Sequence, residues 1–258
     1  MRSHSVRLSA CALTTLVALS ITAQQAQADE WRFTITVDNQ SALYLGSNTS
    51  TSQLVGGDND WTDAETYTAT NAGASDYVYV ACASDHQTLQ GFLGYFENLT
   101  SGAIAKTGDS SWQVFPAGAY AAQLNNPNPW PNSVMPTQTQ VDNAIAYASS
   151  QNLWEATDGF AGWDNDETTA PPSGYTTDYW SGELQFMLPF QEAGIPKNTQ
   201  WIWHDSTEAD PSSGIPDPFR GANHDEFLIF RVPGAVPEPA TLGALSLGAM
   251  LLLRRSRT

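Results

Sequence analysis

The sequence predicts a mainly β protein: an antiparallel β-sandwich or jelly-roll-like domain with one α-helix and long loops. Short runs rich in β-branched and aromatic residues recur through the middle of the 258-residue chain, bounded by Gly, Asn, Asp and Pro. Convincing helical periodicity occurs only once in that middle part. Many antiparallel strands joined by turn-rich segments are typical of sandwiches and jelly-rolls.

The first expected strand covers residues 31–37, where alternation places Trp31, Phe33, Ile35 and Val37 on one face. The last covers residues 226–232, and its sequence is apolar on both faces, which predicts a central strand. Between them the pattern predicts strands at residues 42–45, 77–82, 91–96, 111–115, 183–188 and 199–203.

One helix is expected at residues 137–149. Val141, Ala144, Ile145 and Ala148 are spaced at i, i+3, i+4 and i+7, so one apolar side is available to rest on a sheet. Thr137 stands three residues before Gln140 and forms the pattern of a capping box. Proline-, glycine- and acid-rich sequences predict long loops at residues 125–136, 158–174 and 205–223.

The N-terminus has the pattern of a secretory signal peptide. Arg2 and Arg7 precede an apolar segment at residues 10–23, and Ala26-Gln27-Ala28 supplies small residues for cleavage. We therefore expect signal peptidase to cut after Ala28. Residues 1–28 would be the signal peptide and form an N-terminal helix. Residues 29–235 would be the β-rich domain, and residues 236–258 a separate tail.

The C-terminal tail contains an uncharged run at residues 240–253, which is followed by Arg254 and Arg255. A helix of this length is about 21 Å long, whereas about 20 apolar residues are needed for a full hydrocarbon core. The sequence predicts a short transmembrane helix that spans by thinning the bilayer or by snorkelling of its flanks. The arginines would remain on the cytoplasmic side.

The order of these features resembles a known sorting signal. Pro237, Glu238 and Pro239, then the apolar run, then Arg254 and Arg255, are similar to the PEP-CTERM signal of Gram-negative bacteria. The resemblance is confined to residues 237–258. It implies that an integral-membrane exosortase recognises the Pro-Glu-Pro and cleaves near it, which releases the protein to the cell surface or an exopolysaccharide matrix.

Charge limits the partners of the β-rich domain. Residues 29–236 contain five Lys and Arg against 26 Asp and Glu, whereas the whole chain has a formal net charge of −17. A surface this acidic repels nucleic acids and anionic lipids, so we expect no nucleic-acid partner and membrane contact only through the tail. It attracts cations and favours solubility outside the cell.

Two acid-rich segments are candidate calcium sites, since Ca²⁺ takes oxygen ligands from flexible loops. Neither segment has the glycine and distal glutamate of an EF-hand, and solvated acidic turns are the alternative reading. The candidate ligands are Asp58, Asp60, Asp63, Asp164, Asp166 and Glu167.

Two histidines stand beside acids at the ends of expected strands, His204 before Asp205 and His224 before Asp225. If those strands pair, a metal site of His, Asp and Glu ligands is geometrically possible. The alternative is that these residues cap strands and loops. Cys82 is the single cysteine after residue 28 and lies in an apolar run, which predicts a buried side chain. The sequence has no Gly-x-Ser-x-Gly elbow and no phosphate loop, so no catalytic residue is assigned.

Tryptophan is concentrated between residues 130 and 180. Trp130, Trp163 and Trp180 lie in or beside expected loops, where exposed rings could stack on sugars. The alternative is that these rings cover the ends of the core.

Together these features predict an exported, non-enzymatic protein of the cell surface or extracellular matrix. Its partners would be the signal peptidase, an exosortase and extracellular polysaccharide. A carbohydrate-binding module with an aromatic-lined site is one alternative. A calcium- or metal-dependent enzyme acting on polysaccharide is another.

Overall fold

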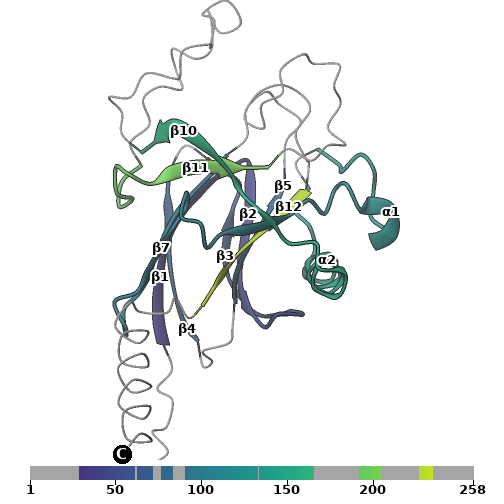
Figure 1. Cartoon of the computed structure of the whole chain (residues 1–258), viewed down its shortest axis with the longest axis horizontal. Coiled ribbons are helices and arrows are strands. Elements are labelled where there is room, and N and C mark those ends of the chain that lie inside the picture. The colour runs from purple at the N-terminus through teal and green to yellow at the C-terminus, as the bar shows by residue number, and fades with distance from the viewer. Residues whose placement is uncertain are drawn as a thin grey trace, which may run out of the picture.

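The computed structural model describes residues 29–61, 63–71, 77–83, 91–132, 134–165, 192–204 and 227–234. This part of the chain is mainly β, with two antiparallel sheets and two helices (Figure 1). The predicted mainly β class is therefore confirmed. The strand expected at residues 183–188 and the terminal helices expected at residues 1–28 and 240–253 lie outside the described residues.

The first sheet contains the N-terminal strand of the domain. Its strand order is β10-β11-β6-β1-β4, with β7 paired to β6. The strands are β1 (Asp29–Asp38), β4 (Glu65–Asn71), β6 (Gly91–Asn98), β7 (Ile104–Lys106), β10 (Asp158–Asp164) and β11 (Gln200–Trp203).

The second sheet contains the last described strand. Its order is β3-β2-β5-β12-β8-β9, so β12 lies inside the sheet as its sequence predicts. The strands are β2 (Gln40–Gly46), β3 (Thr51–Asp58), β5 (Tyr77–Ala83), β8 (Gln113–Phe115), β9 (Glu155–Ala156) and β12 (Phe227–Pro233).

A hydrophobic core fills the space between the two sheets. Alternation along β1 points Trp31, Phe33, Ile35 and Val37 into this core, as expected from the sequence. Removing such side chains from water is the main force that holds two sheets face to face. Other fully buried side chains of the core are Val80, Cys82, Phe92, Phe96, Trp112, Trp203, Leu228 and Phe230.

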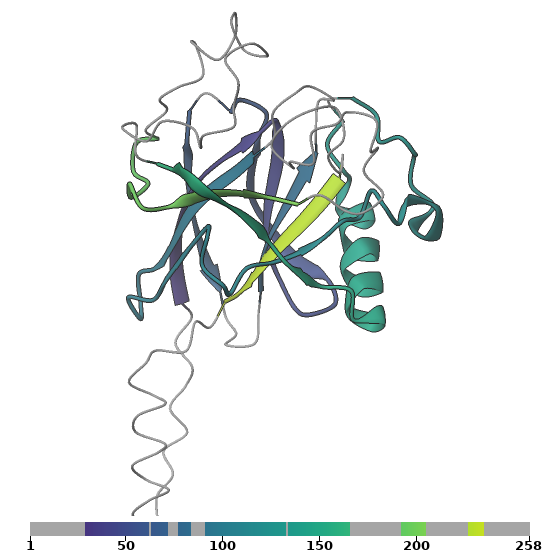
Figure 2. The ribbon, with the colours of Figure 1, turned by 45° about the horizontal axis from the view of Figure 1, so that its top comes forward.

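The outer face of the second sheet is covered by α2 (Gln138–Gln151), which stands beside β12 in Figures 1 and 2. The predicted apolar side of this helix is buried against Phe227 and Ile229 of β12 and against side chains of β2 and β5. Because β12 contributes Leu228 and Phe230 to the other core, it is apolar on both faces. A short helix, α1 (Ala121–Leu124), lies nearby.

The start of α2 agrees with its sequence, whereas its end at Gln151 lies two residues beyond the predicted one. The Thr137 hydroxyl accepts a hydrogen bond from the backbone N–H of Gln140, and the Gln140 side chain accepts one from the backbone N–H of Thr137. This reciprocal capping box satisfies backbone donors that the first turn leaves free. At the other end, Asn152 adopts the left-handed conformation with φ 56°, which is common where helices stop.

Five observed strands were not expected: β3, β4, β7, β9 and β10. The Gly- and Asp-rich sequence of residues 158–164 predicts a loop, but these residues form β10 and pair with β11. By contrast, the described residues from Asn125 to Pro136, which leave out residue 133, contain no strand or helix, in agreement with the predicted loop. All five unexpected strands lie at edges of the sheets or, in the case of β7, pair with one neighbour only.

Both ends of the described domain lie at the same end of the sheets, which we call the base. In the register of the strands, Asp29 is opposite Asn71 and Pro233 is opposite Tyr77. Only residues 72–76 separate Asn71 from Tyr77, so the four residues share one end. Figures 1 and 2 likewise show the start of β1 and the end of β12 together at the lower end of the sheets.

Candidate functional site

The first acidic segment forms a turn after β3. The Asp58 carboxylate accepts a hydrogen bond from the backbone N–H of Asp60 at 3.1 Å, which is the geometry of an Asx turn. Asp60 and Asp63 are exposed. Among the described residues, no three His, Cys, Asp or Glu side chains come close enough to hold a metal ion. Because Asp166 and Glu167 lie outside the described residues, the calcium hypothesis for Asp58, Asp60 and Asp63 stays a prediction.

The second acidic segment follows β10. Asp166 and Glu167 lie outside the described residues, and only the backbone of Asp164 is described, so the structure does not show whether they form a site. The intervening Asn165 is fully buried. Its amide group donates to the backbone oxygens of Glu192 and Ile195, and its carbonyl oxygen accepts from the Glu192 N–H.

The Asn165 contacts bring the two acidic segments near one another through Glu192. The Glu192 side chain accepts a hydrogen bond from the backbone N–H of Ala64 and lies near the Asp63 carboxylate. Burial raises the pKa of Glu192, the Asp63 charge raises it further, and the Ala64 hydrogen bond acts in the opposite direction. Neither Asn165 nor Glu192 was a candidate in the sequence, because their positions depend on contacts between distant segments.

The expectation that Trp130 is an exposed stacking ring is wrong. Trp130 is only 3% exposed, and its ring centroid lies 4.7 Å from that of Phe227. Its indole N–H donates to the backbone oxygen of Val134 at 2.6 Å. The ring therefore covers the end of a core, which was the alternative reading. The backbone of Trp163 is in β10, but its ring is not described, and Trp180 lies outside the described residues.

In the described part of the chain, His204 lies close to the carboxylate of Glu155. His204 follows β11 and is buried, and its Nε2 lies 3.7 Å from a carboxylate oxygen of Glu155. This contact is an ion pair only when the imidazole is protonated. His224, Asp205, Asp225 and Glu226 lie outside the described residues, so the predicted histidine pair stays a prediction.

Cys82 lies near the end of β5 and is completely buried, as its sequence context predicts. Burial raises the pKa of the Cys82 thiol well above its ordinary value. Because the thiolate is the reactive form, this cysteine is protected from alkylation and oxidation.

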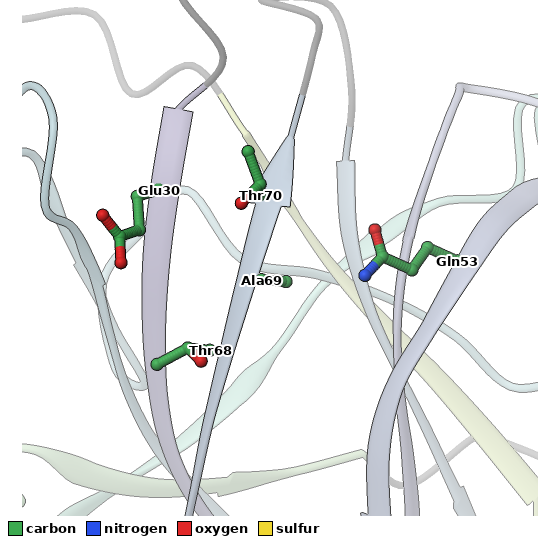
Figure 3. Close-up of a pocket in the computed structure, with 5 residues that line it drawn as sticks. All are labelled: Glu30, Gln53, Thr68, Ala69 and Thr70. Carbon is green, nitrogen blue, oxygen red and sulfur yellow. The ribbon is translucent and has the colours of Figure 1, made fainter.

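A polar pocket of about 420 Å³ opens between the edge strands β3 and β4 near the base (Figure 3). Gln53 of β3 extends toward Ala69 of β4, while Glu30, Thr68 and Thr70 complete the lining. In the described part of the chain, the side chains of Glu30, Gln53, Thr68 and Thr70 make no hydrogen bond. The pocket thus offers a carboxylate, an amide and two hydroxyls to a polar ligand.

A buried cation stands on the outer face of the second sheet, also near the base. Arg231 of β12 is 7% exposed, and its guanidinium carbon lies 3.8 Å from the ring centroid of Trp154 and 4.5 Å from that of Tyr77. Its Nε donates to Gln113 Oε1 and its Nη1 donates to Asn48 Oδ1, both at 2.9 Å. No carboxylate pairs with it among the described residues.

The Arg231 contacts join β12, β8, the β2–β3 turn and the segment after α2. Burial lowers the pKa of Arg231, while the neighbouring Tyr77 and Tyr79 raise it. The guanidinium stays charged at physiological pH, since its ordinary pKa is above 12. No pattern in the sequence indicates this cluster.

None of the helices in the described part has the length and apolar content that a bilayer crossing needs. Comparison of the chain with protein-family models, with curated proteins and with solved structures finds no match. The interpretation of function therefore depends on the residues and geometry of this chain alone.

Proposed function

We propose that the chain is an exported, non-enzymatic protein of the cell surface or extracellular matrix of a Gram-negative bacterium. Its central part would be a jelly-roll-like β-sandwich. The signal pattern at residues 1–28 would direct export, and an exosortase-type enzyme would act at Pro237, Glu238 and Pro239. The strongly acidic composition of residues 29–236 suits a protein that stays soluble outside the cell.

The observation that carries this proposal is the position of the folded domain between the two targeting patterns. β1 begins at Asp29, the residue after the predicted cleavage site, and β12 ends at Pro233, four residues before Pro237. Cleavage at either site would leave every described strand and helix intact. Short connections at both boundaries suit a domain that is processed at its two ends after or during export.

The sorting part of the proposal is tested by changing Pro237 and Glu238 to alanine together. The full-length variant should accumulate uncleaved in the inner membrane, whereas the unaltered protein should reach the cell surface or medium in a shorter form. A matched variant with Pro131→Ala and Glu65→Ala, both at exposed positions, should be processed normally. Normal release of the Pro237 and Glu238 variant would refute the sorting proposal.

A second candidate function, carbohydrate binding, is favoured by the pocket between β3 and β4. Its hydroxyl, amide and carboxylate groups match the hydrogen-bonding groups of a sugar, and none of them is used in the described structure. On a glycan array, the unaltered protein should bind. The double variant with Gln53→Ala and Thr68→Val should lose this binding, whereas the control Thr139→Val on α2 should keep it. A Trp163→Ala variant tests the alternative aromatic site, and binding by none of these proteins would refute this second function.

A further inference from the structure

The base of the two sheets is the end from which both predicted membrane segments leave the domain. The chain enters β1 at Asp29, after the predicted signal peptide, and leaves β12 at Pro233, before the predicted tail helix. The register of β1 with β4 and of β12 with β5 places both residues at the base. The turns around Asp38 and Asp58 belong to the opposite end, since Asp38 pairs with Gly91 and Asp58 with Ser41.

The length of the connection restricts how the domain can stand on a membrane. Six Cα steps separate Gly234 from Ala240, the first residue of the apolar run. At about 3.3–3.6 Å per residue, they reach at most about 22 Å. β1 has ten residues and is about 30 Å long at roughly 3.3 Å per residue. The connection from Gly234 to Ala240 is therefore shorter than the sheets. It cannot reach far enough for the end of the sheets opposite the base to face the membrane while the tail is inserted.

The base also exposes apolar side chains on a single hairpin. Leu99 and Ile104 are 43% and 45% exposed, and both lie at the connection between β6 and β7. This hairpin belongs to the base because the Leu99 N–H donates to the backbone oxygen of Glu30 at 2.7 Å. Isolated apolar residues on a surface are common, but these two lie at the end from which the apolar tail leaves.

We infer that the base faces the membrane while the tail is inserted, with Leu99 and Ile104 in contact with the lipid interface. This inference rests on the proposed function, because it requires the C-terminal tail to enter a bilayer. The partner that the base contacts is a lipid bilayer, and the contact is made by the apolar side chains of Leu99 and Ile104. Asp29 and Glu30 stand at the base, so anionic lipids would be repelled rather than attracted.

The orientation is tested with labels at the two ends of the sheets. The full chain carries Cys11→Ser, and Cys82 is buried and protected from labelling, so one added cysteine is the only reactive thiol. Ser101→Cys places an environment-sensitive fluorophore on the hairpin at the base, and Asn59→Cys places it at the opposite end. Both proteins are reconstituted into phosphatidylcholine vesicles containing lipids with a nitroxide quencher on the headgroup.

The label at residue 101 should be quenched at least twofold more strongly than the label at residue 59. Equal quenching, or stronger quenching at residue 59, in a protein that floats with the vesicles would overturn the orientation and leave the sorting proposal standing. A protein that does not float with the vesicles would refute membrane anchoring, and with it both proposals.

Lipid contact by the hairpin is tested separately. Combining Leu99→Ser with Ile104→Ser should shift the emission of the label at residue 101 toward that of an aqueous environment and weaken its quenching about twofold. Leu54→Ser is the matched control, because Leu54 is 58% exposed but lies on β3, away from the hairpin. Identical emission and quenching in the double variant and the control would show that Leu99 and Ile104 do not touch lipid.

Discussion

Replacing Arg231 with alanine tests whether the buried guanidinium holds the base of the second sheet together. The substitution removes two hydrogen bonds from a charged group and two contacts with aromatic rings. Hydrogen bonds to charged groups contribute about 1.5–3 kcal/mol each, and cation–π contacts about 0.5–2 kcal/mol each. The desolvation of the cation opposes these gains and cancels much of them. We therefore expect Arg231→Ala to lower the free energy of unfolding by about 2–4 kcal/mol.

The assay is equilibrium unfolding in urea, followed by tryptophan fluorescence, with the m-value as a check that the same surface is exposed. Arg32→Ala is the matched control, because Arg32 pairs with Glu97 on a surface where its side chain is 49% exposed. Exposed ion pairs contribute about 0–1 kcal/mol. If Arg231→Ala lowers the free energy of unfolding by no more than Arg32→Ala does, the desolvation of the Arg231 guanidinium cancels its hydrogen bonds and ring contacts. That result would refute the stabilising role of Arg231.

Three further substitutions test local features of the fold. Gly56→Ala should lower the free energy of unfolding by about 1–3 kcal/mol, because the added Cβ would lie 2.3 Å from the ring of Tyr67. Thermal unfolding should show this loss, and the loss should disappear when Tyr67→Ala is also present. Thr137→Ala should cost about 1 kcal/mol through loss of the helix cap, whereas Thr139→Ala at the exposed start of α2 should cost much less in the same urea assay. Glu192→Gln should stabilise the protein at neutral pH, because burial raises the pKa of Glu192 in the folded state and the charged form is disfavoured. That advantage should shrink as the pH falls through the raised pKa of folded Glu192 and should be gone below the ordinary pKa of glutamate. A difference that is constant with pH would contradict the assignment.

The interior strands of both sheets could be predicted from the sequence, whereas the edge strands could not. β1, β5, β6 and β12 are hydrogen-bonded on both sides and buried, so their sequences show strong apolar alternation or continuous apolar runs. The edge strands β3, β4, β9 and β10 satisfy only part of their backbone in a ladder, and β3, β4 and β9 bury few side chains. Glycine and threonine at such positions resemble turn residues, and for this reason β10 was mistaken for a loop.

The helix was predictable because its signals are local. The Thr137 cap and the apolar spacing of α2 lie within one segment and need no information from other elements. Site residues depend on contacts between distant segments. Arg231 lies 118 residues from Gln113 and 183 residues from Asn48, and Asn165 contacts Glu192 across 27 residues. No pattern within a single segment indicates such contacts, and the same limit explains why Trp130 was expected on the surface.

The edges of the two sheets also affect how copies of the protein behave when they are crowded together. An open sheet edge can pair with the edge of a neighbouring molecule, which is the route to edge-to-edge aggregation. Here β9 has two residues, β3 contains Gly56 and Gly57, and β4 carries exposed threonines. Short and polar edges of this kind make poor templates for a foreign strand. A dense layer of these molecules can therefore remain a population of separate domains rather than fusing into one continuous sheet.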